Sequence, residues 1–278
     1  MATIIGVHGI GHQFSGEHSL GEQWLPAIKD GLARAGRELP DEVTFKCAFY
    51  GDLFRPKGKG AIPPYGAKDV DAWEAQLLKA WWEEAARIDP AVRAPDETTK
   101  AGLVTFVQRG LNALTRSKFF SGQLEKMMIS DLKQVYRYFH EDSIRQAARD
   151  SIEKWMNDDT RVIVAHSLGS VVAYEALCAN PQWPVQHLIT LGSPLGIRNL
   201  IFDALQPAPQ RELGAWPGNV QHWTNISDSG DVVALTKKLE PLFMPRIVDV
   251  SVANGMKVHD ASRYLTTREV GDAIAAAI

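Results

Sequence analysis

Short apolar runs alternate with amphipathic segments along most of the chain. Runs rich in Val, Ile, Leu and Thr predict strands, at residues 3–8, 42–50, 161–165, 187–191, 221–227 and 246–252. Apolar residues at helical spacing predict helices at residues 20–35, 168–179 and 266–278. Strands that alternate with helices favour the α/β class, with a mostly parallel central sheet and helices on both of its faces.

The alternation stops in the middle of the chain. Apolar residues at helical spacing predict three further helices there, around residues 71–87, 103–114 and 124–139. No strand pattern separates these helices. We therefore expect a single α/β domain over residues 1–278, with a helical insertion or cap at residues 52–130.

Charge and cysteine content narrow the class of protein. The chain has 30 Lys and Arg against 33 Asp and Glu, a net charge of −3, so its charge gives no argument for a nucleic-acid partner. Cys47 and Cys178 are too few for a disulfide framework, and we expect two reduced thiols in a cytoplasmic protein. The beginning, MATIIGVHGIG, predicts a strand rather than a signal peptide, and no apolar run predicts a transmembrane segment.

One stretch, RVIVAHSLGSVVAYEAL at residues 161–177, passes directly from a predicted strand into a predicted helix. Ser167 therefore lies at the carboxyl end of a strand, where open α/β sheets bind ligands. Ala165 and Gly169 on either side are small, as a tight strand-to-helix turn requires. The pattern is that of the nucleophile elbow G-x-S-x-G, in which the helix N-terminus also favours negative charge at the serine. The alternative is that Ser167 only caps the helix.

A nucleophilic serine needs a general base close to it. Three histidines follow Ser167 in the sequence. His187 and His222 lie in or beside predicted strands, with few acids placed to orient them. His259 lies between the last predicted strand and the last predicted helix, where a loop can bring it over the edge of the sheet. We therefore expect His259 to be the base.

The base in turn needs an acid that orients it. The segment NISDSGDVVAL follows a predicted strand and supplies Asp228 and Asp231. We favour Asp231 because the apolar Val232 and Val233 follow it and can anchor it. Asp228 remains the alternative acid, and either residue could instead stabilise the turn.

A glycine-rich turn, VHGIGH at residues 7–12, follows the first predicted strand. Acyl transfer needs two N–H donors for the developing oxyanion. We expect one donor to be the amide of Leu168, which follows the serine. The other is expected to be the amide of Ile10, with Gly9 as the alternative.

Two other interpretations of this turn are disfavoured. A dinucleotide-binding G-x-G-x-x-G motif would need a glycine where Phe14 stands. His8 and His12 could hold a metal, but no carboxylate or cysteine cluster accompanies them, and we expect no metal site.

Taken together, these segments resemble the α/β-hydrolase superfamily, and within it the lipase-like serine hydrolases that include the GPI inositol-deacylase-like group. The resemblance rests on IIGVHGIGH, VIVAHSLGSVVAYEAL, LITLGSPLG, NISDSGDVVA and VHDASRYL, which occur in the expected order. It implies a Ser167, His259 and Asp231 triad, backbone donors near Ile10 and Leu168, and no cofactor. It implies a serine esterase or lipase-like hydrolase that cleaves ester or related acyl bonds of a small-molecule or lipid-like substrate. Amidase, peptidase or thioesterase activity, or a catalytically silent interaction module, are the alternatives.

The chain departs from the family in two places. Ala165 stands where the elbow motif has its first glycine, and residues 52–130 have no counterpart that we can match. Specificity in this fold depends on such insertions. We expect most of the large apolar side chains of the insertion to hold it against the body and some to line a substrate pocket. These side chains are Trp73, Trp81, Trp82, Phe106, Phe119, Phe120, Met127 and Met128.

Overall fold

The strands of the protein form one parallel sheet. The computed structural model describes residues 3–56, 65–96, 102–120, 124–243 and 246–278. The six strands have the spatial order β2-β1-β3-β4-β5-β6, and every neighbouring pair is parallel. Their bounds are Thr3–Val7 (β1), Thr44–Ala48 (β2), Thr160–His166 (β3), His187–Leu191 (β4), His222–Asp228 (β5) and Ile247–Val252 (β6).

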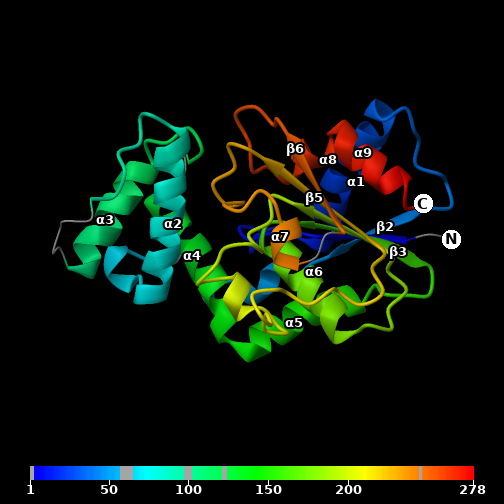
Figure 1. Ribbon diagram of the computed structural model, residues 1–278, viewed down its shortest axis with the longest axis horizontal. Helices are drawn as coiled ribbons and strands as arrows, with labels where there is room; N and C mark the ends of the chain where they lie inside the picture. The colour runs from blue at the N-terminus through cyan, green and yellow to red at the C-terminus, as the bar shows by residue number, and fades with distance from the viewer. Residues whose placement is uncertain (1–2, 57–64, 97–101, 121–123, 244–245) are drawn as a thin grey trace.

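Helices connect and cover these strands (Figure 1). In the described residues the α-helices are Glu17–Arg34 (α1), Ala72–Ile88 (α2), Leu103–Leu114 (α3), Glu125–His140 (α4), Asp142–Glu153 (α5), Leu168–Ala179 (α6), Glu240–Phe243 (α7), Ala261–Leu265 (α8) and Arg268–Ala275 (α9). Short 3₁₀ helices lie at Gly51–Phe54, Ala67–Asp69 and Phe202–Ala204. The parallel sheet and its helices confirm the predicted α/β class.

Both faces of the sheet are buried, which explains the continuous apolar runs. Ile4 and Val162 belong to a core that also contains Trp24 of α1, while their neighbours Ile5 and Ile163 belong to a second core. Successive residues of a strand point to opposite faces, so a strand covered on both sides is apolar at every position. The core that contains Ile4 lies against α1, α8 and α9, and the other lies against α2 to α6.

The helices between β2 and β3 form the side of the molecule away from α1, α8 and α9 (Figure 1). The predicted insertion, 52–130, contains α2, α3 and the first part of α4; its residues 57–64, 97–101 and 121–123 lie outside the described residues. Glu74 of α2 is fully buried and binds Lys133 Nζ of α4 at 2.7 Å. A buried carboxylate needs such a partner, and this pair holds α2 against α4.

Two helices differ from the sequence-based expectations. The segment 266–278 was expected to be one helix, but α8 ends at Leu265 and α9 begins at Arg268. The side chain of Thr267 accepts a hydrogen bond from the amide of Val270, so this threonine acts as an N-cap and starts a new helix. Helix α5 was not expected, because its sequence is mostly polar.

The strand order reverses next to β1. The chain passes from β1 to β2 on one side and then returns to β3 on the other. Loops after β1 and β3 therefore diverge at the carboxyl edge of the sheet and leave a crevice, which is where open α/β sheets bind ligands. The loops that carry the predicted site residues all leave the sheet at this edge.

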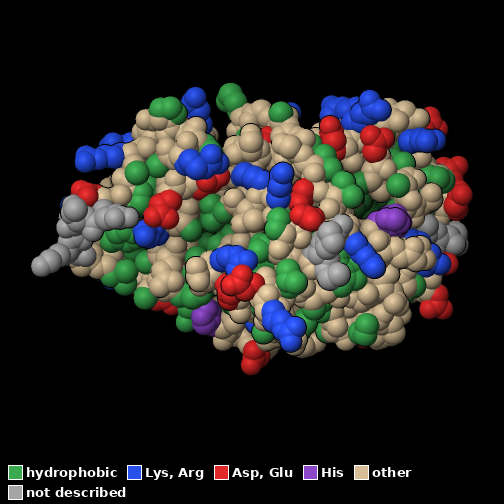
Figure 2. All heavy atoms as spheres, viewed as in Figure 1, with side chains coloured by type: hydrophobic (Ala, Val, Ile, Leu, Met, Phe, Trp, Pro, Cys, Tyr) green, Lys and Arg blue, Asp and Glu red, His purple; other side chains and the backbone are tan. Residues whose placement is uncertain are grey.

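The surface carries both signs of charge. In the view of Figure 2, basic and acidic side chains are interspersed rather than gathered into one patch, in keeping with the small net charge. Within the described ranges, no helix has both the length and the apolar character needed to cross a bilayer.

Candidate active site

Ser167 occupies a strained turn between β3 and α6. Its backbone has φ 53° and ψ −131°, a conformation that a residue with a side chain rarely adopts and that costs about 1–3 kcal/mol. The amide of Ser167 donates to the carbonyl of Leu191 at 3.0 Å, which ties the turn to β4. A Cβ atom on Gly169 would lie 2.3 Å from the carbonyl oxygen of His8, so only glycine lets α6 approach β1 this closely.

Three side chains from three loops form a hydrogen-bonded chain. His259 Nε2 lies 3.0 Å from Ser167 Oγ, and His259 Nδ1 lies 2.7 Å from Asp231 Oδ2. An ionised carboxylate can only accept, so Nδ1 carries the proton and donates it, and Nε2 is left to accept from the serine hydroxyl. The three residues that were expected to converge do lie together at the carboxyl edge of the sheet.

The three residues of this hydrogen-bonded chain differ in their exposure to solvent. Asp231 is fully buried and Ser167 is 3 % exposed, whereas the His259 side chain is 22 % exposed. A charge that develops on the serine or the imidazole is therefore only partly screened by water, and a fixed carboxylate behind the imidazole acts strongly on it.

Asp231 is held in place by several donors. Its Oδ1 accepts from the amide of Val233 at 2.9 Å and from that of Ala234 at 3.3 Å. Its Oδ2 accepts from the Tyr264 hydroxyl at 2.8 Å as well as from His259. Burial, followed by the charge of Asp231, raises the pKa of Tyr264, so this phenol stays a donor. These bonds fix the carboxylate in one orientation towards the imidazole.

Asp228, the alternative acid, has different partners. Its Oδ1 accepts from the amide of Gly230 at 2.7 Å, and its Oδ2 accepts from the amide of Asn254 at 2.5 Å. The first bond shapes the turn after β5. The second joins that turn to the loop after β6, which leads to His259. Asp228 thus contacts backbone amides, whereas Asp231 contacts the imidazole.

The His-Gly turn lies directly against the serine. A Cβ atom on Gly9 would be 2.7 Å from Ser167 Cβ, so the backbone can come this near only at glycine. Ile10 lines the same cleft as Ser167. Among the described residues, the amides of Gly9 and Ile10 have no hydrogen-bond partner. The first amides of a helix also lack intrahelical partners, which applies to Leu168 at the start of α6. These three amides remain the predicted oxyanion donors.

The hydrogen bonds of His8 hold the His-Gly turn in place. It is fully buried; its Nε2 accepts from the amide of Tyr50 at 3.1 Å, and its Nδ1 lies 2.6 Å from the carbonyl of Gly9. The Tyr50 hydroxyl donates to the carbonyl of His8 at 2.5 Å. Burial, and then the nearby His12, lower the pKa of His8 to about 3, so this imidazole stays neutral. Its contacts are structural, and within the described residues no group of three His, Cys, Asp or Glu could hold a metal ion.

Two site residues were not singled out from the sequence. His166 directly precedes the serine, and its Nε2 donates to the carbonyl of His259 at 2.8 Å. Burial, and then the neighbouring His259, lower the pKa of His166 well below its usual value, so the ring is neutral. Tyr264 contacts Asp231 as described above. Both residues lie inside quoted motifs, AHSLG and VHDASRYL, but neither has a spacing that reveals its partner.

The other two histidines that follow the serine lie elsewhere. His187 begins β4 and His222 begins β5, and their rings stack with centroids 4.7 Å apart. The amino ends of these strands are at the edge of the sheet opposite Ser167. Neither ring can reach the serine.

A cleft of about 550 Å³ opens over Ser167 and His259. The insertion supplies part of its wall through Trp81, Phe119 and Phe120. Its other large side chains lie away from the serine. Trp82 and Phe106 line a separate hollow, Trp73 packs on Tyr136 and His140, Met128 is buried in the core, and Met127 is 47 % exposed.

No protein-family model matches the chain, and no curated protein matches it. The evidence for the structural class of this protein is therefore its own fold. The chain is an α/β protein whose six-stranded parallel sheet is compatible with the hydrolase fold.

Proposed function

We propose that this protein is a serine hydrolase of the α/β-hydrolase type, which cleaves carboxylic esters or related acyl bonds through an acyl-enzyme. The observation that carries the proposal is the continuous contact from Asp231 Oδ2 to His259 Nδ1 at 2.7 Å and from His259 Nε2 to Ser167 Oγ at 3.0 Å. Nucleophile, base and orienting acid within hydrogen-bonding reach are the arrangement that activates a serine.

In the first half of the reaction, Ser167 Oγ attacks the acyl carbonyl carbon and its proton passes to His259 Nε2. The carbonyl oxygen becomes an oxyanion, for which the amides of Leu168 and of Ile10 or Gly9 are the proposed donors. Asp231 stabilises the imidazolium and is not itself protonated. The tetrahedral intermediate then expels the alcohol, which takes the proton from His259, and the acyl group remains on Ser167.

In the second half of the reaction, a water molecule replaces Ser167 as the nucleophile. His259 removes a proton from a water molecule whose oxygen attacks the acyl-enzyme. The collapse of the second tetrahedral intermediate returns a proton to Ser167 Oγ and releases the carboxylic acid. Every proton in the two halves passes among Ser167, His259, the alcohol and water, so no further reactant is needed.

Two features support a catalytic role for Ser167 over that of an ordinary helix cap. The side chain of Ser167 makes no hydrogen bond to the first turn of α6, as a capping serine would. Its backbone also keeps a strained conformation, and such strain persists where the surrounding structure imposes it, often at active sites.

Hydrolysis of p-nitrophenyl acetate tests the proposal. Ser167→Ala should lower kcat by at least about 10³-fold, because the nucleophile is lost. Ser170→Ala is a matched control, since Ser170 is a buried serine three residues further on, in α6, whose hydroxyl donates to the carbonyl of Ala165. Equal activity of wild type and Ser167→Ala would overturn the proposal.

Amide, peptide and thioester bonds can be cleaved by the same groups. A panel of esters, thioesters and peptides with a common acyl group separates these activities by their kcat/KM values. Folded wild-type protein that hydrolyses none of them would instead favour a catalytically silent interaction module.

A further inference from the structure

Ser167 lines two hollows of very different size. One is the cleft of about 550 Å³, which His259 also lines. The other is a pocket of about 10 Å³, which includes Leu168 but not His259. Ser167 therefore lies between a wide space and a narrow one, so an ester bound at its Oγ can extend into both.

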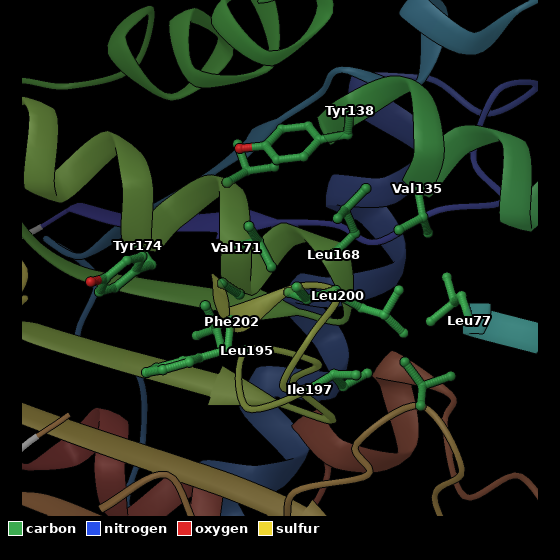
Figure 3. Packing of buried hydrophobic residues seen from close by; sticks show 14 of the residues in the cluster. Leu77, Val135, Tyr138, Leu168, Val171, Tyr174, Leu195, Ile197, Leu200 and Phe202 are labelled. Carbon is green, nitrogen blue, oxygen red and sulfur yellow. The ribbon is translucent and has the colours of Figure 1, made fainter. Parts of the chain in front are cut away.

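The small pocket is apolar and closely walled. Its lining includes Leu77 of α2, Val135 of α4, Leu168 of α6 and Ile197 from the segment after β4. Figure 3 shows these four side chains converging from separate parts of the chain. All four are buried, with at most 5 % of their surface exposed. Such a volume holds about one water-sized group.

The position of His259 decides which part of an ester enters which space. This imidazole has to give its proton to the leaving oxygen, so the leaving group must lie on the side of His259, in the wide cleft. The acyl substituent then points the other way, into the narrow pocket beside Leu168. Hence the pocket limits the acyl group, and the cleft receives the alcohol.

The wide cleft has both apolar and polar walls. Trp81, Phe119 and Phe120 line it together with Gln23, Ser262 and the charged Asp131, Lys257 and Asp260. Basic and acidic side chains are both present, so a single charge on the alcohol would gain little. Its volume is typical of sites for ligands larger than a few atoms.

We propose that the substrates are short-chain acyl esters, acetyl or close to it in size, of a large alcohol without net charge. This inference rests on the proposed function and narrows it. The narrow pocket rejects longer acyl chains because burying them would force apart side chains that are already packed together.

Hydrolysis of p-nitrophenyl acetate, butyrate and octanoate, which share one leaving group, tests the acyl limit. We expect kcat/KM to fall at least about tenfold from acetate to butyrate and further to octanoate. An optimum at octanoate would overturn the inference while leaving the serine hydrolase proposal intact. Absence of turnover for all three esters, together with no covalent labelling of Ser167, would overturn both.

Two neighbouring leucines provide a matched pair of variants. Leu77 lines the narrow pocket; Leu78 does not, and both are fully buried in α2. Leu77→Ala should raise the butyrate-to-acetate ratio of kcat/KM at least about tenfold, and Leu78→Ala should leave it unchanged. A ratio is insensitive to the folded fraction, so loss of stability in either variant does not obscure the result. Equal ratios in the two variants would contradict the assignment of the acyl pocket.

The alcohol is tested with two acetates. Acetyl-hexose should be hydrolysed with a higher kcat/KM than ethyl acetate, because a hexose is large enough to contact the walls of the cleft and ethanol is not. Equal values would contradict the assignment of the cleft to a large alcohol.

Discussion

The phenol of Tyr264 donates a hydrogen bond to Asp231 Oδ2, the same oxygen that accepts from His259. The phenolic oxygen also accepts from the amide of Asp228 at 2.9 Å. One side chain of α8 therefore links both candidate acids and lies behind the imidazole. Tyr264 is fully buried, so these bonds are not shared with bulk water.

Tyr264→Phe should lower kcat about tenfold with little change in KM, because Asp231 loses a donor that fixes its orientation. It should also lower the free energy of unfolding by about 1–3 kcal/mol, since the Asp228 amide loses its acceptor. Steady-state kinetics and urea denaturation measure the two effects. Tyr136→Phe is the control, because Tyr136 stacks on His140 away from the site. An unchanged kcat for Tyr264→Phe would remove Tyr264 from a positioning role.

The two acids should behave differently when changed to the amide. Asp231→Asn should lower kcat by about 10³–10⁴-fold, because an amide cannot hold the imidazole as a carboxylate does. Asp228→Asn should chiefly lower the melting temperature, since Asp228 joins the turn after β5 to the amide of Asn254. Kinetics and thermal denaturation of both variants decide between them. If Asp228→Asn lost more kcat than Asp231→Asn, then Asp228 rather than Asp231 would be the acid that orients His259.

A buried ion pair holds α5 and α6 together. Arg145 Nε donates to Glu175 Oε2 at 2.8 Å, and Tyr138 and the amide of Gln206 also donate to this carboxylate. Glu175→Ala should lower the free energy of unfolding by about 3–5 kcal/mol, because the guanidinium stays buried without its partner. Urea denaturation measures this change.

The control for Glu175→Ala is an ion pair at the surface that also joins an arginine to a glutamate. Arg137 and Glu141 are 35 % and 42 % exposed, and Glu141→Ala should cost no more than about 1 kcal/mol. Similar losses in the two variants would show that the buried pair contributes no more than a surface pair.

Acid should destabilise the protein before its carboxylates titrate. His8 has a pKa of about 3 when folded and about 6.5 when unfolded, so only the unfolded chain binds this proton as the pH falls below about 6.5. His166 is shifted in the same direction. His8 should therefore remove about 2 kcal/mol of stability between about pH 7.5 and pH 5, and His166 should add to this loss.

Urea denaturation at the two pH values tests this. His8→Asn should show about 2 kcal/mol less pH dependence than wild type. His18→Asn, which changes an exposed histidine, is the matched control. An unaltered pH dependence in His8→Asn would show that His8 takes up a proton in the folded state.

Strands β1 and β3 could be predicted because the sheet is buried on both faces there, so each of them contains a continuous apolar run. β3, Thr160–His166, contains the whole of the expected run 161–165. Helix α5 escaped prediction because only Ile144, Arg145, Ala148 and Ile152 of its residues are buried. Its place depends on the ion pair of Arg145 with Glu175, which no local pattern reveals.

At the site, the order of Ser167, an acid and His259 could be predicted because each follows a strand of one parallel sheet. The choice between Asp228 and Asp231 depends on where two side chains point, and sequence spacing carries no such information. The contacts of His166 and Tyr264 join segments that are distant along the chain, so they become visible only after folding.

Covalent labelling with a fluorophosphonate tests the central proposal most directly. Attack of Ser167 Oγ on phosphorus, with loss of fluoride, should add the phosphonyl group to one peptide of wild-type protein and of Ser170→Ala, mapped to Ser167 by mass spectrometry. Ser167→Ala should remain unlabelled. Equal labelling of Ser167→Ala, or no labelling of folded wild-type protein, would contradict the account.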